Sequence, residues 1–145
     1  MIYLDSSCLL SLLWDEEESP AVMIAVAREE VVVITALTEL ETLVQLKAAH
    51  LGGGYNLPRR RLLEAQLTRL YRQPPYEFRA LSGSLLKTAL RQHRNSGGLH
   101  CRAFDRLHLA AMEDLKVRRL MTHDQAQAAA AVAMGFDVVQ PARIA

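Results

Sequence analysis

The stretch Val31-Val32-Val33-Ile34-Thr35-Ala36-Leu37-Thr38 decides the fold class, because a β-branched run leads directly into a helix start. Four consecutive β-branched residues are typical of a strand that is buried on both faces of a parallel sheet. We expect a helix to begin at Thr38 and to end at the three glycines 52–54. Its apolar positions are Leu40, Leu43, Val44 and Leu51. The succession of strand and helix predicts an α/β domain.

The rest of the chain continues this alternation. Further strands are predicted at 2–4, 78–81, 119–122 and 138–139, and helices at 8–14, 19–27, 58–73, 84–94, 102–115 and 125–134. Ser6 and Ser7 are the expected N-cap of the first helix. No internal repeat or long linker interrupts the pattern, so we expect residues 1–145 to form one domain with a largely parallel sheet.

Composition narrows the class of protein further. The chain has 145 residues, half of them hydrophobic and 23% charged, and this apolar fraction argues against a disordered chain. Two cysteines exclude a disulfide-rich scaffold and a Cys-only zinc site, and Cys8 is expected to be a buried reduced thiol. No apolar segment reaches membrane-spanning length and no export signal precedes the first strand, so a cytoplasmic protein is expected.

Charge is distributed unevenly along the chain. Residues 1–51 carry two basic and nine acidic residues, whereas residues 52–102 carry ten basic and two acidic ones. Charge alone favours solvated helix faces that pair with the acidic third, and contact with a polyanion is the alternative. The candidate contacts to such a polyanion or to a protein partner are Arg59, Arg60, Arg61, Arg69, Arg72 and Arg102.

Four acidic residues stand at strand ends or helix starts. Asp5 and Asp124 follow predicted strands, Glu41 lies just after the strand 31–34, and Asp105 falls in the first turn of a helix. Ligands of parallel sheets gather at the carboxyl ends of the strands, so these carboxylates can converge there. Clustered carboxylates repel each other unless cations neutralise them, and an all-oxygen site suits Mg²⁺ or Mn²⁺. Such a site can activate water against a phosphodiester.

Each acid also has a purely structural interpretation. Asp5 and Asp124 could cap helices, Asp105 could complement a helix dipole, and Glu41 stands at capping-box spacing from Thr38. His108 is more often a satisfied core histidine than a ligand. Taken singly, the structural interpretation is favoured for each acid. Taken together, four such acids in an α/β frame favour a functional site.

The same residues resemble the motifs of PIN domains. Ile2-Tyr3-Leu4-Asp5-Ser6-Ser7 is similar to the opening strand and first acid of that family, and 35–41 to the second motif. Residues 102–111, Arg-Ala-Phe-Asp-Arg-Leu-His-Leu-Ala-Ala, are very similar to the third motif, and 120–124 to the strand with the fourth acid. The resemblance spans nearly the whole chain, and its size suggests the VapC-type toxin branch.

The resemblance implies a PIN-like three-layer domain, with a central sheet of four to five strands flanked by helices. It implies an Mg²⁺- or Mn²⁺-dependent endoribonuclease that forms a homodimer and is blocked by a cognate antitoxin. The acidic site would be Asp5, Glu41, Asp105 and Asp124, with Asp5 and Asp105 as the main metal ligands and the hydroxyls of Ser7 and Thr122 nearby. The family spacing from Thr35 selects Glu41 over Glu39. The apolar run favours the same choice, because it should turn Leu40 and Val44 toward the core beside Glu41.

Three other functions are alternatives to this one. A catalytically silent PIN-like module that binds RNA or protein is disfavoured because all four acids are present. A non-toxin PIN nuclease stays open. A phosphotransfer enzyme is disfavoured because Ser7 stands where a second acid would be needed, and because no lysine follows Lys116.

Overall fold

Five strands form one parallel sheet in the computed structural model, which describes residues 1–142. The strands lie in the order β3-β2-β1-β4-β5, and each neighbouring pair is parallel. Their bounds are β1 (Ile2–Leu4), β2 (Val32–Ile34), β3 (Tyr76–Phe78), β4 (Arg119–Met121) and β5 (Asp137–Val139). The predicted α/β class with a parallel sheet is confirmed.

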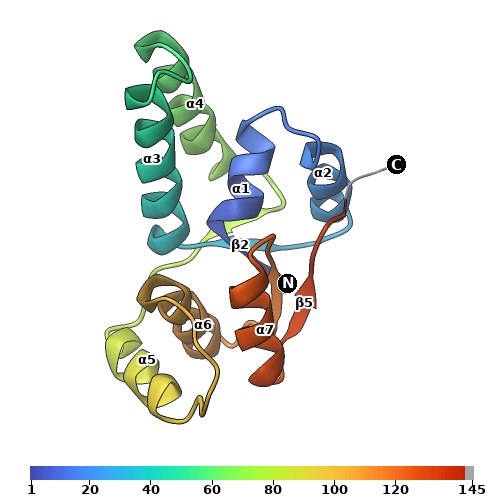
Figure 1. Ribbon diagram of the computed structural model, residues 1–145. Helices are drawn as coiled ribbons and strands as arrows, with labels where there is room; N and C mark the ends of the chain where they lie inside the picture. The colour runs from blue at the N-terminus through green and yellow to red at the C-terminus, as the bar shows by residue number, and fades with distance from the viewer. Residues whose placement is uncertain (143–145) are drawn as a thin grey trace.

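Helices cover the two faces of this sheet (Figure 1). Those on one face are α1 (Ser6–Leu13), α2 (Ser19–Ala27), α3 (Ala36–Leu51) and α4 (Leu57–Leu70). Those associated with the other are α5 (Leu85–Arg94), α6 (Ala103–Leu115) and α7 (Gln125–Ala133), with α5 packed on α6. No helix within residues 1–142 has the length and apolar character needed to cross a membrane.

The central strand β1 separates two hydrophobic cores. Ile2 and Leu4 point to the face of α1 to α4, where the free thiol Cys8 is also buried. Tyr3 points to the opposite face, toward α6 and α7. Successive side chains of a strand alternate between faces, so a fully buried strand needs three apolar residues in a row. The position of β1 in the middle of the sheet follows from this run.

The start and the inward face of α3 differ from the prediction. The helix begins at Ala36 with Thr35 in the N-cap position, so Glu41 is not the last residue of a capping box. Leu40 and Val44 are 53% and 54% exposed, whereas Thr38 is fully buried. The hydroxyl of Thr38 donates to the Leu4 carbonyl (2.9 Å), which ties α3 to the end of β1 and turns the apolar pair outward.

Two further predictions are wrong in detail. The first helix is capped by Asp5 rather than by Ser6 or Ser7. The third strand comprises residues 76–78 instead of 78–81, because it pairs with β2 and β2 ends opposite Phe78. The remaining predicted elements match the observed ones to within three residues.

Candidate active site

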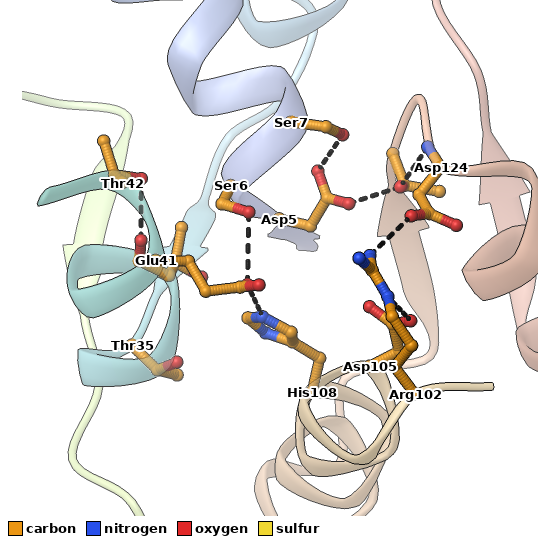
Figure 2. A network of polar contacts seen from close by, with 12 residues as sticks. Asp5, Ser6, Ser7, Thr35, Glu41, Thr42, Arg102, Asp105, His108 and Asp124 are labelled. Atoms are coloured by element: carbon orange, nitrogen blue, oxygen red, sulfur yellow. Dashed lines mark hydrogen bonds and ion pairs between the residues drawn. The ribbon is translucent and has the colours of Figure 1, made fainter. Parts of the chain in front are cut away.

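Four carboxylates from four separate segments lie around the edge of the sheet where β1 and β4 end (Figure 2). Asp5 directly follows β1, and Asp124 follows β4 across a short turn. Glu41 projects from α3 and Asp105 from the first turn of α6. Parallel strands end on the same side of a sheet, which is why residues so distant in sequence meet here.

Asp5 is buried and is engaged through both carboxylate oxygens. Oδ1 accepts hydrogen bonds from the Ser7 hydroxyl (2.6 Å) and from the backbone N–H of Cys8 (3.1 Å), and Oδ2 accepts one from the Thr122 hydroxyl. Burial raises the pKa of the Asp5 carboxyl, while these three hydrogen bonds act in the opposite direction. The two hydroxyls that were expected near the site, those of Ser7 and Thr122, therefore both donate to the Asp5 carboxylate.

Thr122 also connects Asp5 to Asp124. The backbone N–H of Asp124 donates to the Thr122 hydroxyl oxygen (2.9 Å). The Asp124 carboxylate caps α7 by accepting from the N–H of Gln127 (2.9 Å). The turn after β4 thus holds Asp124 beside Asp5 through one shared hydroxyl.

Arg102 bridges Asp105 and Asp124 (Figure 2). Its Nε lies 3.2 Å from Asp105 Oδ2, and its Nη2 lies 3.1 Å from Asp124 Oδ2. The Arg102 side chain is 73% exposed, whereas that of Asp105 is only 5% exposed. The guanidinium therefore covers the carboxylates from the solvent side. This contact between Arg102 and the acids was not foreseen from the sequence.

Glu41 is held by a buried chain of hydrogen bonds that the sequence did not reveal. His108 Nε2 contacts Glu41 Oε1, His108 Nδ1 lies 2.7 Å from the Tyr3 hydroxyl, and that hydroxyl lies 2.8 Å from the Thr35 hydroxyl. A carboxylate only accepts, so His108 Nε2 donates, and a neutral imidazole then accepts at Nδ1 from Tyr3. The Ser6 hydroxyl donates to the same Glu41 oxygen (3.1 Å).

His108 is the satisfied core histidine that was expected, and it also positions a candidate site residue. It is fully buried and packs edge-on against Tyr3 and Phe104. The only sequence signal was its spacing of three residues from Asp105, which places the two side chains on neighbouring parts of one helix. Its partner Glu41 lies 67 residues away, and nothing local identifies that pair.

Glu39 points away from this group. It lies against Tyr71, where burial first and Glu39 second raise the pKa of the phenol. Two residues along a helix differ by about 200° in direction, so Glu39 and Glu41 face different neighbours. Of the two acids, Glu41 is thus the one that lies in the acidic group, and its role there stays a prediction. The argument for it from Leu40 and Val44 is wrong, because both side chains are exposed.

The arginines of the basic middle segment lie elsewhere. Arg59, Arg61, Arg69 and Arg72 are exposed on or just after α4, and Arg60 is paired with Glu64 at 2.8 Å. Among the described residues, no hydrogen bond or ion pair links these five arginines to the four acids. Of the basic candidates, Arg102 alone touches the acidic group in the part of the chain that the structure describes.

The acidic group has the chemistry of a cation site but not the geometry of a finished one. Carboxylate oxygens are the ligands that Mg²⁺ and Mn²⁺ prefer, and Asp105 and Asp124 already share a cation in Arg102. Within residues 1–142, however, no three His, Cys, Asp or Glu side chains form a group that could hold a metal ion. Because Arg102 already contacts Asp105 and Asp124, a cation bound by these two carboxylates would compete with its guanidinium.

The acids at the carboxyl ends of its parallel strands define the molecule as an α/β protein with an acidic site. A comparison with known protein families identifies its family. The model of the PIN domain matches residues 2–133. The chain belongs to the PIN-domain family, whose members are generally nucleases. A comparison with curated protein sequences gives no match.

Solved structures share this fold at low sequence identity. Mycobacterium tuberculosis VapC20, a sarcin–ricin loop-cleaving toxin, is similar with a TM-score of 0.73 and 15% identity, over 97% of this chain and 100% of that one. FitAcB from Neisseria gonorrhoeae gives 0.73 and 18%, over 97% and 98%. A toxin–antitoxin complex from Klebsiella pneumoniae gives 0.65 and 17%, over 99% and 100%. These likenesses establish the PIN fold.

Proposed function

We propose that residues 1–145 form one PIN domain that acts as an Mg²⁺- or Mn²⁺-dependent endoribonuclease. The observation that carries the proposal is the joining of Asp5, Asp124 and Asp105 through Thr122 and Arg102 at the carboxyl edge of the sheet. Carboxylates gathered at one edge repel one another, and Arg102 pairs only with Asp105 and Asp124. Cation-dependent chemistry on a phosphodiester accounts for keeping them there.

Different acids have different tasks in this proposal. Asp5 and Asp105, the two most buried, would be the main metal ligands, with Asp124 and Glu41 beside them. The bound metal would supply a water activated as nucleophile and charge stabilisation for the leaving oxygen. Ser6 and His108 both contact Glu41 at Oε1, and Oε2 would orient water or join the metal site. Ser7 and Thr122 fix the orientation of Asp5.

The biological role that we propose is that of a toxin in a type II toxin–antitoxin pair. Support comes from the similar structures, which include the toxin VapC20 and a toxin–antitoxin complex. On this proposal the chain acts in the cytoplasm as a homodimer and is held inactive by a cognate antitoxin. Expression of the chain alone should arrest growth, and expression of Asp5→Asn should not.

The exposed arginines of α4 are the proposed contacts to RNA phosphates or to the antitoxin. Each Lys or Arg contact to single-stranded RNA adds about 0.7 to the slope of log affinity against log salt. Reversing the charge of Arg59 and Arg61 should flatten that slope without changing which sites are cut. An unchanged slope would show that these arginines are solvated and do not contact RNA.

Cleavage of a mixed RNA pool tests the activity. We expect cleavage with Mg²⁺ or Mn²⁺ and none with EDTA, and loss of cleavage in Asp5→Asn and Glu41→Gln. Glu39→Gln is the matched control on the same helix and should cleave like the wild type. RNA binding without cleavage under every metal condition would favour the alternative, a silent PIN-like module that binds RNA or protein. Cleavage without any growth arrest would indicate a non-toxin PIN nuclease.

A further inference from the structure

Arg106 is a buried cation that lacks a carboxylate partner among the described residues. It is only 6% exposed, and its Nε is buried without a hydrogen-bond partner. Nη1 lies 3.3 Å from the sulfur of Met134, and the thiol of Cys101 also lies beside the side chain. Neither sulfur carries a compensating charge, since burial raises the pKa of the Cys101 thiol. An unpaired buried charge destabilises the folded state, so the retention of Arg106 requires an explanation.

The Arg106 side chain lines a cavity of about 350 Å³ between α5, α6 and α7. This volume lies at the lower end of the range for small-molecule sites. The polar groups of the wall are the side chains of Arg91, Gln92, Asn95, Ser96 and Glu113. Most of these are hydrogen-bond donors, and they surround a cation whose hydrogen bonds are incomplete.

The charges of the wall favour an anion. Arg91 and Arg106 contribute two positive charges, and Glu113 contributes one negative charge. The Glu113 carboxylate is already engaged by Arg91 and by the side-chain amide of Gln92 (2.7 Å), which lower its pKa. It is therefore not the missing partner of Arg106, and one positive charge is left over in the cavity.

This cavity is separate from the acidic site. None of the four carboxylates lines it. Asp105 and Arg106 are consecutive on α6, and consecutive residues of a helix differ by about 100° in direction. Asp105 thus faces the edge of the sheet, while Arg106 faces the α5 and α7 side of the same helix.

We propose that this cavity binds an anion of the phosphate class, with Arg106 as its buried anchor and Arg91 at its rim. Guanidinium groups bind phosphate oxygens through charge-assisted, often bidentate hydrogen bonds, and such an anion would supply the charge that Arg106 lacks. The anion could be a free phosphate or nucleotide, or a phosphodiester of a bound RNA. The proposal does not depend on the nuclease activity, because it concerns the metal-free protein.

Thermal melting and calorimetry of metal-free protein test the proposal, with phosphate and pyrophosphate as probes. Both should raise the melting temperature beyond the effect of chloride at equal ionic strength. Arg106→Met should weaken binding by about tenfold or more, because it removes the charge-assisted contacts. The same variant, free of ligand, should melt no lower than the wild type, because it replaces an unpaired buried charge by an apolar side chain. Arg28→Met, at an exposed arginine that ends α2 on the opposite face of the sheet, is the control and should bind like the wild type.

Two further arms complete the test. Arg91→Met should also weaken binding, and its 54% exposed side chain makes loss of the fold no concern. Binding of a short single-stranded RNA in EDTA distinguishes an RNA phosphodiester from a free anion. If the cavity holds an RNA phosphodiester, Arg106→Met should weaken RNA binding. If the cavity holds a free anion, Arg106→Met should leave RNA binding unchanged. Absence of binding by all three probes would overturn the proposal. So would phosphate binding that survives both Arg106→Met and Arg91→Met.

Discussion

The Asp5 carboxylate has two tasks that do not exclude each other. One oxygen caps α1 through the backbone N–H of Cys8, and the other accepts from Thr122 at the acidic edge. Asp124 likewise caps α7 and takes part in the acidic group. A cap uses one lone pair of one oxygen, which leaves the remainder of a carboxylate for a cation. Single residues at helix starts are therefore compatible with both the structural and the functional interpretation.

Arg102 competes with metal for the same carboxylates. Arg102→Met removes the guanidinium from Asp105 and Asp124, and we expect the affinity for Mn²⁺ to rise by about tenfold, the equivalent of one charge-assisted hydrogen bond. Isothermal titration of Mn²⁺ into metal-free protein measures this. Arg61→Met, exposed on α4, is the control and should not change the affinity. An affinity of Arg102→Met equal to that of the wild type would show that the guanidinium does not compete.

Tyr3 fixes the direction of the hydrogen bonds that end on Glu41. Tyr3→Phe removes the donor to His108 Nδ1 and leaves the Thr35 hydroxyl without the Tyr3 hydroxyl as a partner. The variant should lower the free energy of unfolding by about 1–3 kcal/mol. Urea denaturation measures the loss, and RNA cleavage should fall along with it because Tyr3 no longer fixes the tautomer of His108, which contacts Glu41. Tyr55→Phe is the matched control, since that phenol only donates to the Leu46 carbonyl (2.9 Å) at a half-buried position. Equal effects of both variants on cleavage would contradict the role given to Tyr3.

Hydrophobic periodicity predicts the wrong core-facing side for the helix α3. Its buried positions are Leu37, Thr38, Thr42 and Leu46. The two threonines can be buried because their hydroxyls donate to backbone carbonyls, Thr38 to Leu4 and Thr42 to Thr38 (2.7 Å). A pattern of apolar letters does not record this compensation. The helix itself and its place after β2 were predictable, and its rotation about its axis was not.

The rotation of α3 leads to a stability prediction. Leu40→Gln and Val44→Thr should each change the free energy of unfolding by less than about 0.5 kcal/mol, because both side chains are more than half exposed. Leu46→Ala on the same helix is fully buried and should cost about 2–5 kcal/mol. Urea denaturation of the three variants decides the matter. A large loss in Leu40→Gln would show that Leu40 is covered by a second chain.

The topology of the whole molecule explains where the acids meet. The chain builds β1, β2 and β3 with helices on one face, then adds β4 and β5 on the other side of β1 with helices on the opposite face. The order therefore reverses between β1 and β4, and ligands of open parallel sheets bind at such a reversal. Acids at strand ends could be predicted from sequence for this reason. The contacts of Arg102 and His108 could not, because they depend on how α6 packs against α3 and α7.

Metal binding should stabilise the whole molecule, because the acids join segments from both halves of the sheet. At one hundred times its dissociation constant, Mn²⁺ adds about 2.7 kcal/mol by linkage, which for a chain of this length raises the melting temperature by about 5–10 °C. The shift should be smaller in Asp5→Asn, although asparagine caps a helix as well as aspartate does. The metal-free variant should melt at or above the wild type, because a buried charge is lost. Asp15→Asn, an exposed carboxylate outside the site, should keep the full shift. Equal shifts in wild type and Asp5→Asn, read from melting curves with and without Mn²⁺, would remove Asp5 from the set of ligands.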